Sequence, residues 1–358
     1  MYKFENRYVY LDILRALAII FILFWHVSNQ FATNLTNWKV AISVLSLARI
    51  GIPLFLMISG ALLLKNKYVD IGEFFKKRFK RIFTPHICWV IIYFALGLTL
   101  VTDLYGLYAY DTPASFCIEY FVSIFFSFSD FSSIFWFIWC IIGFYLTVPI
   151  LNSFIKDHEL KGVEYVLIIA IAFTLIPTLG LDKSNIADRF KFAEPAFLLC
   201  LYPLLGYYLH KKEFNIKNKY MAIIGLALFI LGYLLSLSSM YILGRPDISI
   251  QYLNINHLFI IIESAGLFLL FKYLNTGIIF DKFHILLKMI LSLSICSFGM
   301  YFVHFVLLKL IPAEFLTQFL VGKAYIWIPV FGVTLVFLSW IIILIMSKIP
   351  VIKWLSAT

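Results

Sequence analysis

Residues 9–30 read VYLDILRALAIIFILFWHVSNQ, a mostly apolar run that also contains Asp12, Arg15 and His26. About 20 consecutive apolar residues are enough for an α-helix to cross the hydrocarbon core of a bilayer. The run is longer than the apolar core of a usual signal peptide, and no small-residue cleavage pattern follows it. We therefore predict a retained transmembrane helix at the start of the chain.

The rest of the 358-residue chain has the same character. Hydrophobic residues make up 63% of it and charged residues 13%, and the mean hydropathy is +0.95, whereas soluble domains typically carry about 25% charged residues. We predict an all-α integral membrane protein with about ten transmembrane helices in a single membrane domain. The expected spans are roughly 9–30, 40–64, 83–101, 132–153, 163–180, 192–209, 219–240, 254–274, 290–310 and 324–347. The apolar segment 115–129 is short and contains Glu119, which favours an interfacial or re-entrant piece.

Lysine and arginine alternate between the predicted loops in a way that fixes the orientation. If the N-terminus is cytoplasmic, the inside segments hold 20 of the 29 basic residues, the outside segments hold seven, and two lie within spans. Cytoplasmic loops are the ones that carry excess Lys and Arg, so both termini are expected in the cytoplasm. The net charge of +10 belongs to these loops, and we expect no nucleic-acid partner. The five cysteines are scattered, and we expect no metal site.

The ionisable residues of the first span share one face. From Arg15 to His26 a helix turns through about three whole turns and rises about 16 Å, and Asp12 lies within about 40° of the same line. Ionisable groups inside a span face a protein interior or a wet cavity and mark function. The alternative is that Asp12 pairs with Arg15 and that His26 bonds a neighbouring helix.

Three further arginines are placed to bind an anion. Arg49 lies in the outer half of the second span, at a depth near that of His26, and its rigid fork suits a carbonyl, carboxylate or phosphate oxygen. Packing against backbone carbonyls is an equal alternative for it. Arg78 and Arg81 lie three residues apart in what we interpret as a basic loop, and they suit a phosphate-bearing ligand or anionic lipid headgroups.

These segments resemble a known family, the ten-helix membrane acyltransferases called acyltransferase family 3. The first span, YLDILRALAIIFILFWH, is similar to the family's signature of an arginine and a histidine separated by ten residues. RIGIPLFLMISGALLL resembles the second-span motif, and FFKKRFKRIFTP resembles the RxxR segment. Weaker similarities are IFWFIWCIIGFYLTVPIL and SFGMYFVHFVLL. Within the family, the chain looks most like small O-acetyltransferases such as that of enterobacterial common antigen.

The resemblance implies a reaction and roles for residues. Acetyl-CoA or another acyl-CoA would be the donor, and a hydroxyl of a cell-envelope glycan the acceptor, in a multi-pass protein of a prokaryotic plasma membrane. His26 would act as general base or carry the acyl group. Arg49 would stabilise the oxyanion that develops during acyl transfer. The expected acyl-CoA-binding residues are Arg15, Arg78, Arg81 and Asp12. Supporting candidates are Ser59, Trp136, Glu194, Glu263 and His304.

A transporter or flippase for a glycan or lipid precursor is the main rival function. Polar residues on interior faces would suit it as well. Against it, the spans show no two halves with matched helix breaks, and the arginine pair would have no role.

Overall fold

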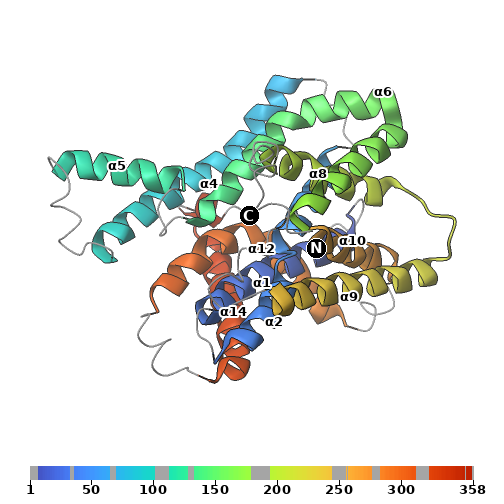
Figure 1. Ribbon diagram of the computed structural model, residues 1–358. Coiled ribbons are helices and arrows are strands. Elements are labelled where there is room, and N and C mark those ends of the chain that lie inside the picture. The colour runs from blue at the N-terminus through green and yellow to red at the C-terminus, as the bar shows by residue number, and fades with distance from the viewer. Residues whose placement is uncertain are drawn as a thin grey trace.

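The computed structural model describes residues 7–32, 36–64, 70–100, 113–127, 133–178, 194–243, 255, 257–275, 283–311, 322–350 and 352–356. Every regular element in these ranges is helical (Figure 1), so the predicted all-α class is confirmed. Seven of the described helical segments are long and apolar enough to cross a membrane.

Within the described residues, nine of the ten predicted spans lie on one main helix each, and the second span is divided between two. The elements are α1 Val9–Ala32, α2 Trp38–Ala48, α3 Gly51–Leu63, α4 Ile71–Leu100, α5 Pro113–Phe125, η2 Ser133–Phe135, α6 Trp136–Thr178, α8 Glu194–Lys211, α9 Asn218–Leu243, α10 Leu258–Tyr273, α12 His284–Lys309, α14 Ala324–Lys348 and η6 Lys353–Ser356. Two predicted spans share α6, and the sixth and eighth correspond to the shorter helices α8 and α10.

The basic segment between the second and third spans is a helix, so our prediction of a loop there is wrong. Helix α4 begins at Ile71, because the Asp70 carboxylate accepts hydrogen bonds from the backbone N–H groups of Gly72 (2.7 Å) and Glu73 (3.2 Å). Such an N-cap satisfies amide groups that would otherwise lack partners. Arg78 and Arg81 therefore project from the first turns of a helix that continues into the membrane.

The regular hydrogen bonding of the second span is interrupted at Arg49 and Ile50, between α2 and α3, although both residues keep right-handed helical backbone angles. Pro53 explains the break, because its ring lacks an N–H and would clash with the carbonyl of Arg49 in a continuous helix. At the break, Gly51 lies directly on α1, where an added Cβ would be 2.8 Å from the backbone oxygen of Ala18. The close approach at Gly51 thus places the segment next to Arg49 against the first span.

Helix α6 contains the fourth and fifth predicted spans and turns back on itself (Figure 1). The turn comes at Glu159, whose backbone has φ 51° and ψ −147°. Only glycine adopts such angles without strain. For any other residue the strain costs about 1–3 kcal/mol.

Glu159→Gly should therefore raise the free energy of unfolding by about 1–2 kcal/mol, seen as a higher melting temperature of the detergent-solubilised protein. Asp157→Gly is the matched control, because Asp157 is exposed and its backbone is helical. That change should lower stability by about 0.5–1 kcal/mol. Equal losses in both variants would contradict the strain at Glu159.

The contacts between helix ends show the alternation that the charges predicted. Ends predicted to be cytoplasmic meet where the Tyr10 hydroxyl bonds His210 of α8. Ends predicted to be outside meet where Tyr241 of α9 donates to the Lys39 carbonyl (3.1 Å) and where Ala324 N–H donates to Asn37 Oδ1 (3.3 Å). These helices thus run in the predicted relative directions, while the side that faces the cytoplasm stays a prediction from charge.

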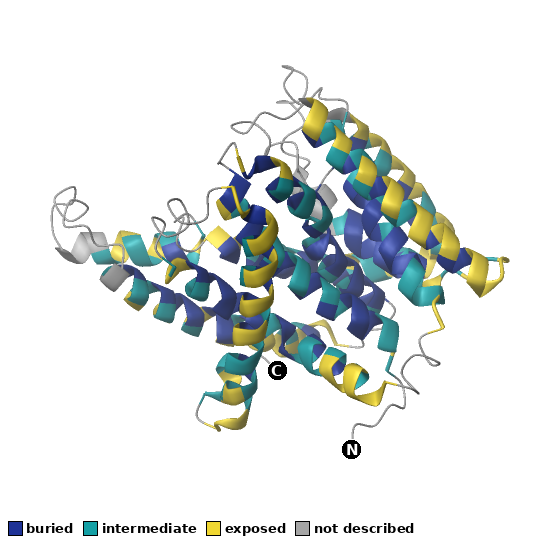
Figure 2. Ribbon diagram, turned by 90° about the horizontal axis from the view of Figure 1, so that it is seen from below, coloured by how far each residue is buried: buried dark blue, intermediate teal, exposed yellow. Residues whose placement is uncertain are grey.

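Helix α1 lies inside the bundle, in contact with α2, α3, α10, α12 and α14. Figure 2 shows the buried residues gathered in the middle and exposed residues along the outer faces. On α9 and α14 the exposed side chains are largely apolar, for example Ile223, Leu231 and Val333, as lipid contact requires. Helix α5 pairs with α4 at one side (Figure 1), and its 13 residues are too few to span a bilayer.

Helices α3 and α8 approach each other backbone to backbone at two glycines. A Cβ on Gly60 would lie 1.9 Å from the carbonyl oxygen of Pro203, and one on Gly206 would lie 2.0 Å from that of Met57. Small residues at such crossings let membrane helices pack closely. This contact holds α3, and with it the Arg49 break, against α8.

Gly60→Ala should therefore destabilise the protein by about 1–3 kcal/mol, because backbone rather than a flexible side chain occupies the space of the new methyl group. Thermal unfolding in detergent measures the loss. Gly72→Ala is the control, since its nearest neighbour within 4 Å is a side-chain oxygen of Asp70 at 3.2 Å. A melting temperature unchanged by Gly60→Ala would contradict the tight crossing.

Candidate active site

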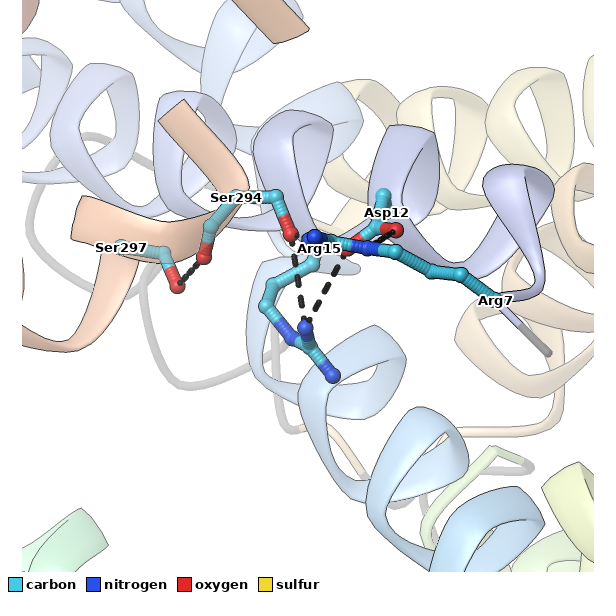
Figure 3. Close-up of polar contacts among 5 residues, drawn as sticks. All are labelled: Arg7, Asp12, Arg15, Ser294 and Ser297. Atoms are coloured by element: carbon cyan, nitrogen blue, oxygen red, sulfur yellow. Dashed lines mark hydrogen bonds and ion pairs between the residues drawn. The ribbon is translucent and has the colours of Figure 1, made fainter. Parts of the chain in front are cut away.

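Asp12 is buried near the start of α1, and all its described contacts are with Arg7, Arg15 and Ser294. Arg7 Nε lies 2.5 Å from Oδ2 and Nη2 lies 2.9 Å from Oδ1, while the Ser294 hydroxyl donates to Oδ1 at 2.6 Å. Arg15 Nη1 lies 3.5 Å from Oδ1 (Figure 3). The carboxylate is thus engaged by two cations and a hydroxyl. This geometry favours the alternative for Asp12, that it anchors Arg15 and does not itself face a ligand.

Arg15 keeps donors available for a ligand. Its Nη1 donates to Ser294 Oγ at 3.3 Å, and Figure 3 shows its other terminal nitrogen directed away from Asp12 and Ser294. The side chain is 27% exposed. A guanidinium has five N–H donors, and the described residues take up only those on Nη1.

Two other helices bring groups to Arg15. Arg81 of α4 and Tyr145 of α6 lie close enough to interact with it electrostatically. On the same face of α4, Arg78 lies over the Phe74 ring at 5.9 Å, and that ring contacts Tyr145 at 6.3 Å. We call Arg15, Arg78 and Arg81 the arginine site.

The arginine site carries excess positive charge. Its nearby described carboxylate, Asp12, already binds Arg7 in a two-pronged ion pair. Arg15 and Arg81 repel each other unless an anion lies between or beside them. The geometry therefore suits a ligand with several negative charges, such as a chain of phosphates.

Near the other end of α1, His26 lies against His304 of α12. Their ring centroids are 5.0 Å apart, and Trp25 and Phe305 flank His26 at 4.9 and 5.4 Å. Arg49 lies over the Trp25 ring at 5.2 Å and acts electrostatically on His26. The expected proximity of Arg49 and His26 is thus present. We call His26, His304, Arg49 and Trp25 the histidine site.

Three buried polar atoms of the histidine site lack hydrogen-bond partners. Within the described part of the chain, Trp25 Nε1, Arg49 Nε and His304 Nε2 have no hydrogen bond, although His304 Nδ1 lies 3.2 Å from the Met300 carbonyl. Most buried polar groups in proteins are hydrogen-bonded, and each exception calls for an explanation such as water or ligand. Three such atoms around one histidine favour a polar ligand there.

The supporting candidates lie in different places. Ser59 donates to the Phe55 carbonyl of its own helix at 2.8 Å, which is a structural contact. Trp136 is exposed at the start of α6. Glu194 begins α8, but its side chain lies outside what the structure describes. Glu263 is fully buried in α10 without a described partner.

A family model described as an acyltransferase domain matches residues 8–346, nearly the whole chain. The chain belongs to acyltransferase family 3. It is therefore a membrane acyltransferase, and the predicted family is confirmed. No curated protein and no solved structure matches the chain. The narrower resemblance to small O-acetyltransferases stays a prediction.

The arginine site and the histidine site lie near opposite ends of α1. The arginine site and the histidine site share α1, and the rise from Arg15 to His26 is about 16 Å. Between them α1 is packed against α12, α14 and α3. One rigid helix thus sets the distance between the arginine site and His26.

Several residues of these two sites were not predicted from the sequence. Ser294, Tyr145 and Trp25 gave no signal, because hydroxyls and aromatic rings are common in apolar spans. Tyr202 of α8 is fully buried and acts electrostatically on Arg49. Arg7 was counted only as a cytoplasmic charge, yet it binds Asp12.

Proposed function

We propose that this acyltransferase moves an acetyl group from cytoplasmic acetyl-CoA to a hydroxyl of a cell-envelope glycan on the outer side of a prokaryotic plasma membrane. The main support is the arrangement of α1, which joins a site of excess positive charge to a histidine with unpartnered polar neighbours. The arginine site suits the phosphates of CoA, and the extended pantetheine arm would carry the thioester toward His26.

In the proposed reaction, His26 is the general base, because a neutral imidazole has a ring nitrogen with a lone pair that can accept a proton. The neutral imidazole removes the proton of the acceptor hydroxyl as its oxygen attacks the thioester carbon. Arg49 stabilises the negative charge that develops on the carbonyl oxygen. The C–S bond then breaks, the acetyl ester is released, and the thiolate of CoA takes the proton from His26.

His304 has a supporting role in this scheme. Its ring packs on His26, and its Nδ1 lies near a backbone carbonyl, which leaves Nε2 available. Holding one nitrogen at a carbonyl fixes the tautomer of a histidine. His304 can thus orient His26 or bond the acceptor through Nε2.

The direct test incubates the purified protein with acetyl-CoA labelled in the acetyl group and measures both binding and release of free CoA. We expect saturable binding, and release of CoA that increases with extracts of the host's envelope glycans. Mass spectrometry of those glycans with and without the gene should show the loss of an acetyl mass. A protein that neither binds acetyl-CoA nor alters any envelope acetyl group would contradict the proposal.

A second measurement separates the base from a covalent mechanism. Intact-protein mass spectrometry after rapid quenching, with acetyl-CoA and no acceptor, should show no acetyl adduct if His26 acts only as a base. A stoichiometric adduct on His26 would instead assign it as the acyl carrier.

A further inference from the structure

Helices α1 and α12 run side by side and in the same direction past both sites. Ser294 of α12 bonds Asp12 of α1 at 2.6 Å, and His304 packs on His26 with 5.0 Å between ring centroids. The turns that follow His26 and His304 therefore lie on the side that the loop charges predict to be outside. An acceptor that approaches from that side meets these turns before it reaches His26.

Lys309 lies in the last turn of α12, on this outer side of the histidine site. Its Nζ lies 5.3 Å from the centroid of the Phe305 ring, and the same ring is 5.4 Å from that of His26. The ammonium and the imidazole are thus no farther apart than the sum of these two distances. Phe305 is buried, whereas Lys309 is exposed. A positive charge with three N–H donors is thereby held near His26 and remains open to a ligand.

The positive charges around His26 are not matched by negative ones in the described structure. Arg49 lies over the Trp25 ring at 5.2 Å, and its buried Nε has no hydrogen bond. Among the described residues, neither Arg49 nor Lys309 forms an ion pair. Both cations attract an anion, and they do so more strongly where the surroundings exclude water. The histidine site therefore suits a ligand that carries negative charge as well as hydroxyl groups.

Asn29 adds neutral hydrogen-bonding groups on the same outer side. It follows His26 by three residues and Trp25 by four on α1, so the three side chains are neighbours on the helix surface. Within the described part of the chain, the buried atoms Asn29 Oδ1 and Trp25 Nε1 both lack hydrogen bonds. A carboxamide has an acceptor oxygen and two N–H donors. It can therefore bond a sugar hydroxyl, which both donates and accepts.

We propose that Asn29 and Lys309 form an acceptor subsite for a sugar that carries a carboxylate or a phosphate. Asn29 bonds a hydroxyl of the sugar beside His26, and Lys309 pairs with the anionic substituent through a charge-assisted hydrogen bond. Lys309 is thus a specificity-determining residue, because a neutral sugar leaves its charge unused. This assignment rests on the proposed transfer to an envelope glycan, whose chemistry it narrows to anionic sugars.

Binding of three matched sugars tests the subsite without acetyl-CoA. The probes are the methyl glycosides of glucose, glucuronic acid and glucose 6-phosphate, which differ only at C6. Saturation-transfer NMR on the purified protein in nanodiscs gives the three dissociation constants. Wild type should bind at least one anionic sugar about fivefold more tightly than the neutral sugar, as a partly exposed ion pair allows. The anion that binds more tightly identifies the substituent as a carboxylate or a phosphate.

Three variants test the two residues. Lys309→Gln should bring the three dissociation constants within about twofold of one another, with the affinity for the neutral sugar unchanged. Lys323→Gln is the matched control and should keep the preference, because Lys323 is an exposed lysine at the start of α14, also on the predicted outer side. Asn29→Ala should weaken binding of all three sugars by about three- to tenfold and leave the preference intact, because it removes hydrogen bonds to a hydroxyl.

Three results would overturn the proposal: equal binding of the three sugars by wild type, binding of none, or a preference that survives Lys309→Gln. The last result would reduce Lys309 to a charge that complements the dipole of α12. Lys309 is exposed, so its variant should fold, and the wild-type comparison decides independently of it. Sugar binding that depends on Lys309, in a protein that transfers no acetyl group, would contradict the proposed reaction and leave the subsite in place.

Discussion

Replacing His26 with alanine should lower acetyl transfer by about a thousandfold, the range that a well-placed general base supplies. The hydroxyl of the acceptor would then have no group to take its proton. His26 lies far from the arginine site, so binding of acetyl-CoA should stay within about twofold of wild type, because additivity holds for distant sites. Initial rates with labelled acetyl-CoA and equilibrium binding of the same compound measure the two effects.

His284→Ala is the matched control for this prediction. His284 is an exposed histidine at the start of α12, the same helix that carries His304. Its removal should leave transfer unchanged, which shows that the loss is specific to the histidine site. A well-folded His26→Ala protein that still transfers acetyl groups would refute His26 as the base.

The double change Arg78→Ala with Arg81→Ala should weaken binding of acetyl-CoA by roughly a hundredfold. Each hydrogen bond to a charged group contributes about 1.5–3 kcal/mol, and both arginines lie at a site whose described carboxylate is already paired with Arg7. The dissociation constant, measured on solubilised protein, should rise while the maximal rate changes little.

Lys76→Ala with Lys80→Ala removes the same charge from the same helix. Both lysines are exposed, as Arg81 is, but unlike Arg81 neither is among the groups that act electrostatically on Arg15. Exposed charges of this kind contribute at most about 1 kcal/mol, so the affinity should fall by less than about fivefold. Equal losses in the two double variants would mean that α4 attracts acetyl-CoA by its net charge alone, or that the arginines only set the topology.

The first span shows which features can be predicted from the sequence and which cannot. Hydropathy and helical periodicity predicted α1, and they placed Arg15 and His26 along one side of it. They could not show that Asp12 is held by Arg7 and Ser294, because Ser294 comes from α12. A contact between helices far apart in the chain has no signature in local spacing.

The helix ends were predicted less well, for local reasons. Asp70 caps α4 and makes the basic segment helical, although a run of lysines and arginines reads as a loop. The turn of α6 at Glu159 lies between the predicted spans 132–153 and 163–180, as expected, although the exact residue is neither a proline nor a glycine. In contrast, Pro53 does mark the break beside Arg49, so that interruption could have been found from the sequence.

The histidine site was predicted in part. His26, Arg49 and His304 were all candidates, because ionisable residues inside spans are rare and functional. Tyr202 was not, since a tyrosine in an apolar helix is typical of packing and of membrane interfaces. Tyr202 precedes Pro203, where α8 crosses α3 closely, and only the structure shows that crossing.

The most direct test of acetyl transfer across the membrane supplies labelled acetyl-CoA to one face of sealed vesicles. Inside-out vesicles, which expose the cytoplasmic face, should incorporate label into glycan within their lumen, and His26→Ala vesicles should incorporate none. Right-side-out vesicles should incorporate label only after they are made permeable. Equal incorporation from intact vesicles of both orientations would contradict a donor site on the cytoplasmic side and an acceptor site on the other.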